Sequence, residues 1–173
     1  MKKIVFVIVI MLVIIFLNKD VDQVMIPADA IRFRVIASSN SVCDQKLKYD
    51  IKDNLIKDVP ILFSGVNSLI NSKNTLSSNL ENIKTSIRNT LAYHNKDIEY
   101  NVALGLNNFP QKIHNGVILP KGDHESLVIT LGDGKGDNFW CILFPPLCLL
   151  DRNENLEETE YKLFVREILN RHF

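Results

Sequence analysis

The chain has 173 residues, of which 20 are basic and 20 are acidic, so its formal net charge at pH 7 is zero. This length suits one ordinary domain, and the neutral balance excludes the basic footprint of a nucleic-acid-binding protein. The three cysteines are too few for a dense disulfide scaffold.

The start of the chain predicts export. Lys2 and Lys3 precede an unbroken apolar run, IVFVIVIMLVIIFL at residues 4–17, as in the charged start and apolar core of a secretory signal. As a helix this run would span about 21 Å, against roughly 30 Å for a bilayer core. The NKDVDQV that follows lacks a small-residue cleavage signal. We therefore expect a signal peptide or N-terminal membrane anchor at 1–17, a tether at 18–29 and a single α+β domain at 30–173.

The first predicted strand carries two arginines. Apolar and basic residues alternate here: Ile31, Arg32, Phe33, Arg34 and Val35. This is the period of a strand with one buried face. The two arginines would then share the exposed face, where guanidinium groups suit recognition of a carboxylate. A solvated strand face without function is the alternative.

A helix is predicted after this strand. The polar run SSNS at 38–41 suits a turn, and Ser41 followed by Asp44 resembles a capping box. One helix face is then marked by Leu47, Ile51, Leu55, Ile56 and Val59. Pro60 is expected to end this helix.

A second, longer helix is predicted from one apolar stripe. Its members are Leu69, Leu76, Leu80, Ile83, Ile87 and Leu91. The opposite face is rich in Asn and Ser and is expected to be solvated. We interpret the stripe as core packing and not as a cofactor site.

The second half of the chain changes to strand periodicity. Alternation is clearest at 98–106, and shorter strands are predicted in NGVILP, ESLVITLG and FWCILF, with a turn at 132–137. An amphipathic helix is expected between 157 and 172. The predicted fold is α+β, with an N-terminal strand, two amphipathic helices, a mainly antiparallel sheet and a C-terminal helix.

The sequence offers little catalytic chemistry. The four histidines lack the spacing of zinc sites, and no nucleotide-binding or hydrolase motif is present. We therefore predict no catalytic residue, no metal and no cofactor. A Cys-His nucleophile at Cys141 is the alternative, although its apolar neighbours disfavour the thiolate.

Two segments resemble a known family. AIRFRVIASSNSVCDQKLKYDIKDNL, at 30–55, is similar to the family's opening, I-R-x-R-V-I-A-x-S-[DN]-S followed by D-Q-x-L-K. VILPKGDHESLVITLGDGKGDNFWCILFPPLCLLD, at 117–151, is similar to its second signature, G-x-G-x-x-x-x-W-C-x-x-F-P-P-L-C. The family is stage II sporulation protein R of endospore-forming bacteria. The resemblance covers roughly residues 25 to 151.

The resemblance implies signalling without catalysis. It implies export from the forespore into the space between the forespore and mother-cell membranes. There the protein would activate a membrane-bound aspartic protease that cleaves pro-sigma-E to active sigma-E. An exported small hydrolase or thiol-dependent enzyme of the cell envelope is the alternative.

Cys141 and Cys148 are expected to approach each other and form a disulfide. A disulfide needs Cα atoms within about 7 Å, whereas an extended chain would separate these residues by roughly 23 Å. The chain must therefore reverse between them, and Pro145-Pro146 is the natural place, with or without a cis bond. Two reduced, buried thiols are the alternative.

Residues 140–148 are predicted to form a reversed loop that is presented to the protease. Both faces of the strand at 139–144 are apolar, and exposed apolar patches often mark partner sites. Trp is also favoured at interface hot spots. The alternative is that Trp140 is an ordinary core residue. The candidate partner-binding residues are Arg32, Arg34, Asn40, Trp140, Phe144, Pro145 and Pro146.

Overall fold

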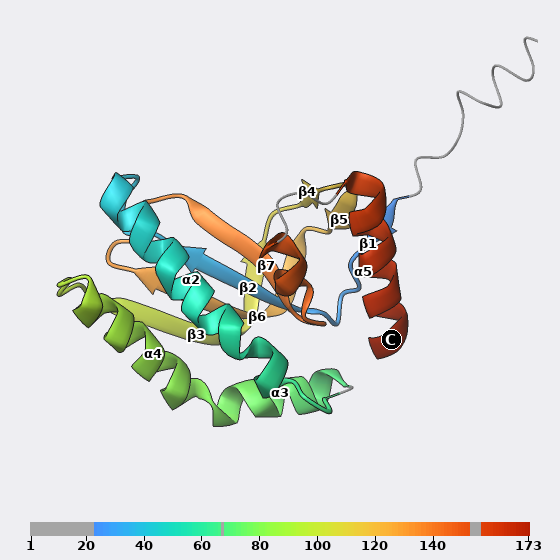
Figure 1. Ribbon diagram of the computed structural model, residues 1–173, viewed down its shortest axis with the longest axis horizontal. Coiled ribbons are helices and arrows are strands. Elements are labelled where there is room, and N and C mark those ends of the chain that lie inside the picture. The colour runs from blue at the N-terminus through green and yellow to red at the C-terminus, as the bar shows by residue number, and fades with distance from the viewer. Residues whose placement is uncertain (1–22, 67, 153–156) are drawn as a thin grey trace, which may run out of the picture.

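A computed structural model describes residues 23–66, 68–152 and 157–173 (Figure 1). The predicted export segment at 1–17 and the first part of the tether lie outside the described residues. The strands are β1 (Val24–Met25), β2 (Ile31–Ile36), β3 (Tyr100–Phe109), β4 (Lys112–His114), β5 (Val117–Leu119), β6 (Gly122–Leu131) and β7 (Asn138–Phe144). The helices are α2 (Val42–Leu62), α3 (Leu69–Ser78), α4 (Leu80–Tyr93), the 3-10 helix η1 (Leu147–Arg152) and α5 (Glu158–His172). The predicted α+β class is confirmed.

The strands form a larger and a smaller sheet. The larger sheet has the order β3-β6-β2-β7 and the smaller one the order β1-β5-β4. In the larger sheet, β2 pairs antiparallel with β7, and β3 pairs antiparallel with β6. The central pair, β2 with β6, is parallel, and the long connection that this needs runs through three helices, β3, β4 and β5.

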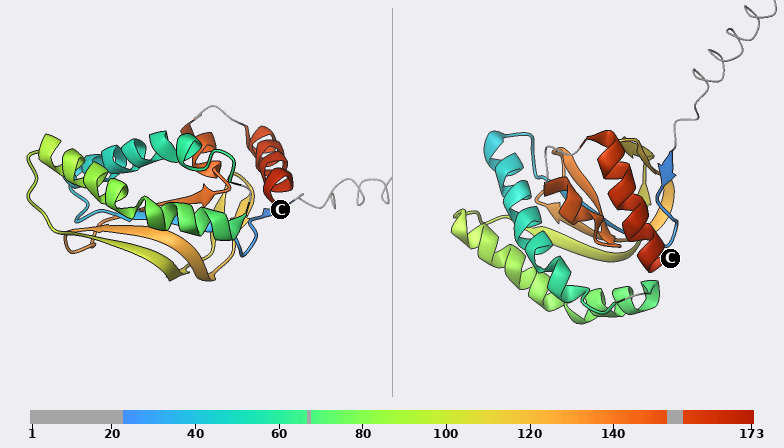
Figure 2. Two further views of the ribbon diagram at one scale, coloured as in Figure 1. Left: turned by 90° about the horizontal axis from the view of Figure 1, so that it is seen from below. Right: turned by 45° about the vertical axis from the view of Figure 1, so that its right-hand side comes forward.

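The elements are stacked in layers around two cores. Helices α2, α3 and α4 cover one face of the larger sheet (Figure 2), and the larger core lies between them. The second core joins the smaller sheet, α5 and part of β7; its buried members are Val24, Ile26, Ala30, Val117, Ile142, Leu147, Tyr161 and Val165. Val24 and Ile26 fall in the predicted tether, so part of that segment belongs to the folded domain. No helix of the described residues is long and apolar enough to cross a membrane.

The first helix extends past the expected end. Pro60 lies inside α2, which continues to Leu62, so the prediction that Pro60 ends the helix was wrong. The N–H of Phe63 donates to the carbonyl of Val59 at 3.0 Å. The Phe63 ring is buried, and its centre lies 5.5 Å from that of the Phe144 ring. Core packing therefore holds the last turn, although Pro60 cannot donate a hydrogen bond.

The expected single long helix is two helices that meet at Asn79. The Asn79 side chain donates to the carbonyl of Thr75 at 2.9 Å, at the end of α3. Its own carbonyl accepts from the N–H of Ile83 at 3.0 Å, at the start of α4. The prediction of one helix was wrong because the spacing of the apolar residues continues across Asn79, so the sequence pattern does not reveal the break between the two helices. Leu76 and Ile83 still pack in the same core.

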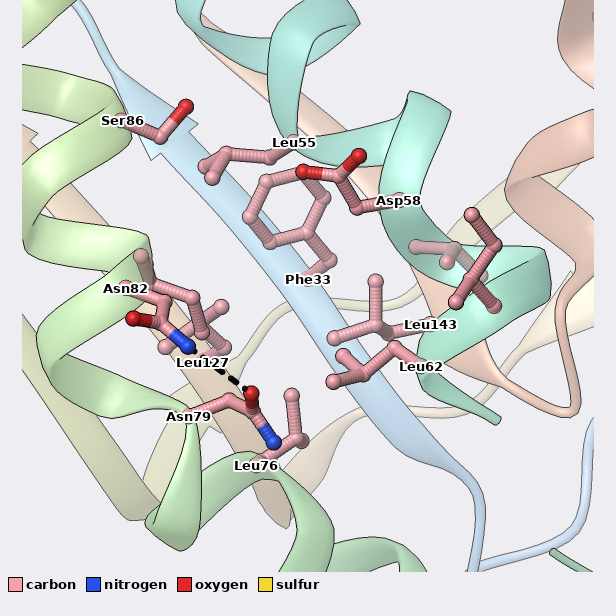
Figure 3. A pocket seen from close by; sticks show the side chains of 13 residues that line it. Phe33, Leu55, Asp58, Leu62, Leu76, Asn79, Asn82, Ser86, Leu127 and Leu143 are labelled. Carbon is pink, nitrogen blue, oxygen red and sulfur yellow. Dashed lines mark hydrogen bonds between the residues drawn. The ribbon is translucent and has the colours of Figure 1, made fainter. Parts of the chain in front are cut away.

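A cavity of about 430 Å³ lies between α2 and the bend of α3 and α4 (Figure 3). Phe33 and Leu127 of the larger sheet line it, and Asn82 donates to Asn79 at 3.1 Å beside it. None of the predicted site residues lines this cavity.

Candidate partner-binding site along strand β7

Strand β7 is one of the two edge strands of the larger sheet, and different layers cover its two faces. Cys141 and Leu143 belong to the core under the helices. Ile142 belongs to the core under the smaller sheet and α5. Both apolar faces of this part of the strand are therefore buried.

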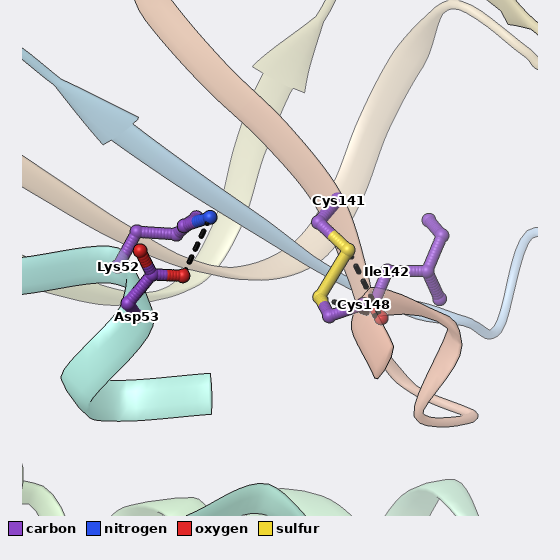
Figure 4. The surroundings of a disulfide bond; sticks show 5 residues. All are labelled: Lys52, Asp53, Cys141, Ile142 and Cys148. Carbon is purple, nitrogen blue, oxygen red and sulfur yellow. Dashed lines mark hydrogen bonds and ion pairs between the residues drawn. A yellow bond between two sulfur atoms is a disulfide. The ribbon is translucent and has the colours of Figure 1, made fainter. Parts of the chain in front are cut away.

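The chain reverses directly after β7 (Figure 4). The Phe144–Pro145 peptide bond is cis, and the N–H of Leu147 donates to the carbonyl of Pro145 at 2.7 Å. The reversal brings Cys141 and Cys148 together in a disulfide, with their Cα atoms 5.5 Å apart. The disulfide therefore links η1 covalently to β7.

This turn is packed inside the domain, which differs from the presented loop that we expected. Its covered residues include Phe144, Pro145 and Cys148. The ring of Phe144 lies 5.5 Å from that of Phe63, the residue directly after α2, and 5.3 Å from that of His172 on α5. These two helices cover the turn, so Phe144 and Pro145 contribute to the core and not to a surface. Pro146 stays half-buried.

We expect Cys148→Ala to lower the free energy of unfolding by about 2.5 kcal/mol, because the bond closes a short loop in the unfolded chain. Chemical denaturation of the oxidised chain measures this change. Cys43 is free and exposed, so Cys43→Ala is the matched control and should leave the stability unchanged. Equal unfolding midpoints for Cys148→Ala and the unaltered chain would contradict a stabilising bond.

Trp140 lies in a cluster of aromatic and cationic side chains. The guanidinium carbon of Arg34 lies 4.4 Å from the centre of its ring, and the Nζ of Lys112 lies 5.6 Å from it. The ring of Phe109 meets it edge-on at 5.3 Å. Arg34 Nε also donates to Asn138 Oδ1 at 3.0 Å, and burial lowers the Arg34 pKa. Trp140 is half-buried and belongs to neither core cluster, so it forms a fixed, partly open aromatic surface.

Arg32 does not share the exposed position that we predicted for the arginine pair. Its side chain is 1% exposed, because Pro120 and Phe109 pack against it. Its Nη2 donates to the carbonyl of Pro120 at 2.7 Å, and its guanidinium lies 5.3 Å from the centre of the Phe109 ring. Its Nε has no hydrogen-bond partner among the described residues, and desolvation lowers its pKa to about 10. Of the predicted pair, only Arg34 lies near the surface.

The burial of Arg32 makes a prediction about stability. A buried cation without a carboxylate is costly, but its aliphatic stem fills space. We therefore expect Arg32→Met to be as stable as the unaltered chain or more stable. Arg32→Ala, which also leaves a void, should lose about 2–4 kcal/mol. Equal losses for both variants in chemical denaturation would show that the charge itself is stabilising.

A groove of about 660 Å³ runs between β7, α2 and β4. Its lining includes Tyr49, Lys52, Lys112, Ile113, Phe139 and Trp140. Tyr49 and Ile113 are 47% and 66% exposed. Lys52 Nζ lies 2.7 Å from a carboxylate oxygen of Asp53 and 5.0 Å from the centre of the Phe139 ring. Open aromatic area of this kind is typical of protein-binding surfaces.

Asn40 joins the two segments that carry the family resemblance. Its Oδ1 accepts from the N–H of Asp137 at 2.7 Å and from Gln45 Nε2 at 3.1 Å. A Cβ at Gly136 would lie 2.4 Å from the carbonyl oxygen of Ser39, so the close approach of the two loops requires glycine there. Asn40 is exposed, but its side chain is engaged in holding the turn that leads into β7.

The start of α2 is fixed by Ser39, Ser41 and Asp44. The Ser41 hydroxyl accepts from the N–H of Asp44 at 3.1 Å, as the capping pattern predicts. The Asp44 carboxylate does not bond to the N–H of Ser41; it accepts from the Ser39 hydroxyl at 2.6 Å instead. This hydrogen bond is the main cause that lowers the pKa of Asp44.

The lowered Asp44 pKa predicts a dependence of stability on pH. Because the folded-state pKa lies below the ordinary 3.8, the carboxylate stabilises the fold above that pH, and the contribution is lost as pH falls through the folded value. Asp44→Asn should therefore cost about 1 kcal/mol at neutral pH. The difference should shrink as the pH is lowered below 3.8. Unfolding free energies of both chains across this range measure it, and a constant difference would contradict the assignment.

The described residues give little support to the catalytic alternative. Cys141 is held in the disulfide and so offers no thiolate. Among the residues that the structure describes, no group of three or more His, Cys, Asp or Glu side chains could hold a metal ion. His94 Nε2 lies 2.8 Å from Asp50 Oδ2 on the helical side of the molecule, away from the groove.

Comparison with known proteins identifies the family. The model of the family described as stage II sporulation protein R matches residues 27–154. The chain belongs to the stage II sporulation protein R family. Stage II sporulation protein R of Bacillus subtilis (strain 168) is 36% identical over 141 residues, which cover 80% of this chain and 63% of that protein. No solved structure matches the chain.

The family assignment covers most of the candidate site. The matched residues include β2 to β7 and η1, whereas β1 and α5 lie outside them. The three elements that bound the groove (α2, β4 and β7) and the disulfide turn therefore belong to the family region, whereas Ile26 and Tyr161 of its lining lie outside it. The family is named for a stage of sporulation and not for a reaction.

Proposed function

We propose that this member of the stage II sporulation protein R family is an exported signalling protein. It activates a membrane-bound aspartic protease of the mother cell, which cleaves pro-sigma-E to active sigma-E. The observation that carries the proposal is the family match over residues 27–154. The chain spans only 63% of the length of its Bacillus subtilis relative. An activity of the whole relative is therefore only a proposal for this chain.

Two features of the chain support an extracytoplasmic site of action. Lys2, Lys3 and the apolar run at 4–17 have the pattern of an export signal. The Cys141–Cys148 disulfide suits an oxidising compartment outside the cytoplasm. We propose the space between the forespore and mother-cell membranes as that compartment.

Activation by binding alone requires a difference in affinity. The domain would bind the active arrangement of the protease more tightly than the idle one and so raise its population. The groove beside Trp140 supplies a preordered surface for this purpose, since its side chains are held by Arg34, Phe109 and Asn138 before any partner arrives.

Deleting residues 4–17 in a sporulating host that depends on this chain tests the proposal. Transcription from a sigma-E-dependent promoter should disappear, and replacing the segment by an unrelated export signal should restore it. Full transcription from the chain without any export signal would contradict an extracytoplasmic role.

A further inference from the structure

We propose that the free edge of β7 binds an extended, acidic segment of a partner protein by strand addition. In this mode, main-chain hydrogen bonds hold a peptide against an open sheet edge, and side-chain pockets select its residues. Strand β7 is an edge strand of the larger sheet. The disulfide turn covers its far end, which leaves the part from Asn138 to Trp140 beside the groove.

The register of β7 shows which main-chain groups point outward. The N–H of Ala37 donates to the carbonyl of Asp137, one step beyond the register pair of Ile36 and Asn138. In an antiparallel pair such bonded positions alternate with unbonded ones. The main-chain groups of Asn138, Trp140 and Ile142 therefore point away from β2. The position of the Ile142 carbonyl oxygen supports this direction, because the oxygen lies 3.0 Å from Cys148 Sγ, on the side of β7 away from β2.

The groove gives an added strand a place to lie. It is bounded by β7, by α2 and by β4, which is itself the outer strand of the smaller sheet. Side chains of an added strand alternate between its two faces. On one side they would meet Tyr49 and Phe139, whose rings lie 6.5 Å apart. On the other side they would meet Trp140 and Ile113.

The charges in the groove select an acidic occupant. Arg34 and Lys112 both lie over the Trp140 ring. Among the described residues, no carboxylate lies within ion-pair distance of either cation. Asp53, the acidic residue of the lining, is already paired with Lys52. A glutamate or aspartate placed beside Trp140 would supply the missing charge.

The chemistry of the occupant follows from the groove, but its source rests on the proposed function. If the chain activates a protease, an extended acidic segment of that protease is the occupant. Binding of short peptides is measured without any processing reaction. A failure of the groove proposal is therefore distinguishable from a failure of the proposed function.

The test uses the acetylated and amidated peptide Thr-Val-Glu-Val-Thr, titrated into the isotope-labelled full chain in detergent micelles. We expect saturable shifts of the Asn138 and Trp140 amide signals at peptide concentrations of about 1 mM. The same peptide with lysine in place of glutamate should bind at least about tenfold more weakly. A peptide with every amide N-methylated keeps the side chains but cannot donate, and it should not bind.

Charge-reversal variants separate the groove from general attraction. Lys112→Glu should weaken binding of the acidic peptide about tenfold. Lys57→Glu makes the same change in charge on the other side of α2 and should have no effect. No saturable shifts at Asn138 and Trp140, equal binding of the N-methylated peptide, or equal effects of the two variants would overturn the proposal. Dimerisation of the chain that Lys112→Glu abolishes would overturn it too, because the occupant would then be a second copy.

Discussion

Phe144→Ala is expected to lower the free energy of unfolding by about 3–5 kcal/mol. Phe144 is 0% exposed, and its ring contacts Phe63, directly after α2, and His172 on α5. Removing it would leave a void where the disulfide turn meets two helices, and such a void does not collapse fully. The domain should then be largely unfolded or degraded when it is produced in cells.

Chemical denaturation followed by circular dichroism measures the loss in Phe144→Ala. Phe164→Ala is the matched control, since Phe164 lies on α5 and is 44% exposed. That control should lose less than about 1 kcal/mol. A folded Phe144→Ala protein of normal stability that fails to support sigma-E activation would contradict the core assignment. That outcome would indicate that Phe144 contacts the partner.

Trp140→Ala is expected to behave in the opposite way. The ring is half-buried outside both cores, so its loss should cost only about 1–2 kcal/mol of stability, mainly from the Arg34 and Phe109 contacts. If the ring anchors a partner in the groove, activation of the protease should fall about 30-fold, as for a hot spot worth 2 kcal/mol. The protein should still accumulate in its folded form.

Activation and thermal melting, measured on the same Trp140→Ala preparation, separate the two roles. Tyr93→Ala is the matched control, because Tyr93 is an 83% exposed aromatic residue on α4, away from the groove. It should change neither quantity. A stability loss of about 3–5 kcal/mol in Trp140→Ala would show that the ring belongs to the core. Normal activation would show that the ring does not bind the partner.

Local patterns predicted the elements well. The alternation at 31–35, the Ser41 cap and the strand at 139–144 all have their expected structures. Each depends on residues close together in the chain, whose periodicity or hydrogen bonding is visible in the sequence. The reversal at Pro145-Pro146 was predictable for the same reason, because Cys141 and Cys148 can meet only if the chain turns between them.

Exposure could not be predicted in this way. Alternation placed Arg32 and Arg34 on one strand face, but Pro120 and Phe109 pack over the end of that face where Arg32 lies. Its contact with Pro120 joins residues 88 apart in sequence. The presented turn was misjudged likewise, because α2 and α5 pack over Phe144 from distant parts of the chain. Which layer covers which end of a sheet is decided by tertiary contacts, and a single sequence does not display them.

The groove itself was also hidden from the sequence. Trp140 and Arg34 were predicted as candidates, but Lys112, Tyr49 and Ile113 were not. They carry no motif, and they lie near Trp140 only because β4 and α2 fold beside β7.

Reconstitution tests the central claim most directly. The full chain, the membrane-bound aspartic protease and pro-sigma-E are combined in lipid vesicles, with the chain on the side opposite pro-sigma-E. The account predicts that pro-sigma-E is cleaved only when the chain is present. Cleavage of equal rate and extent without the chain would contradict its role as the activating signal.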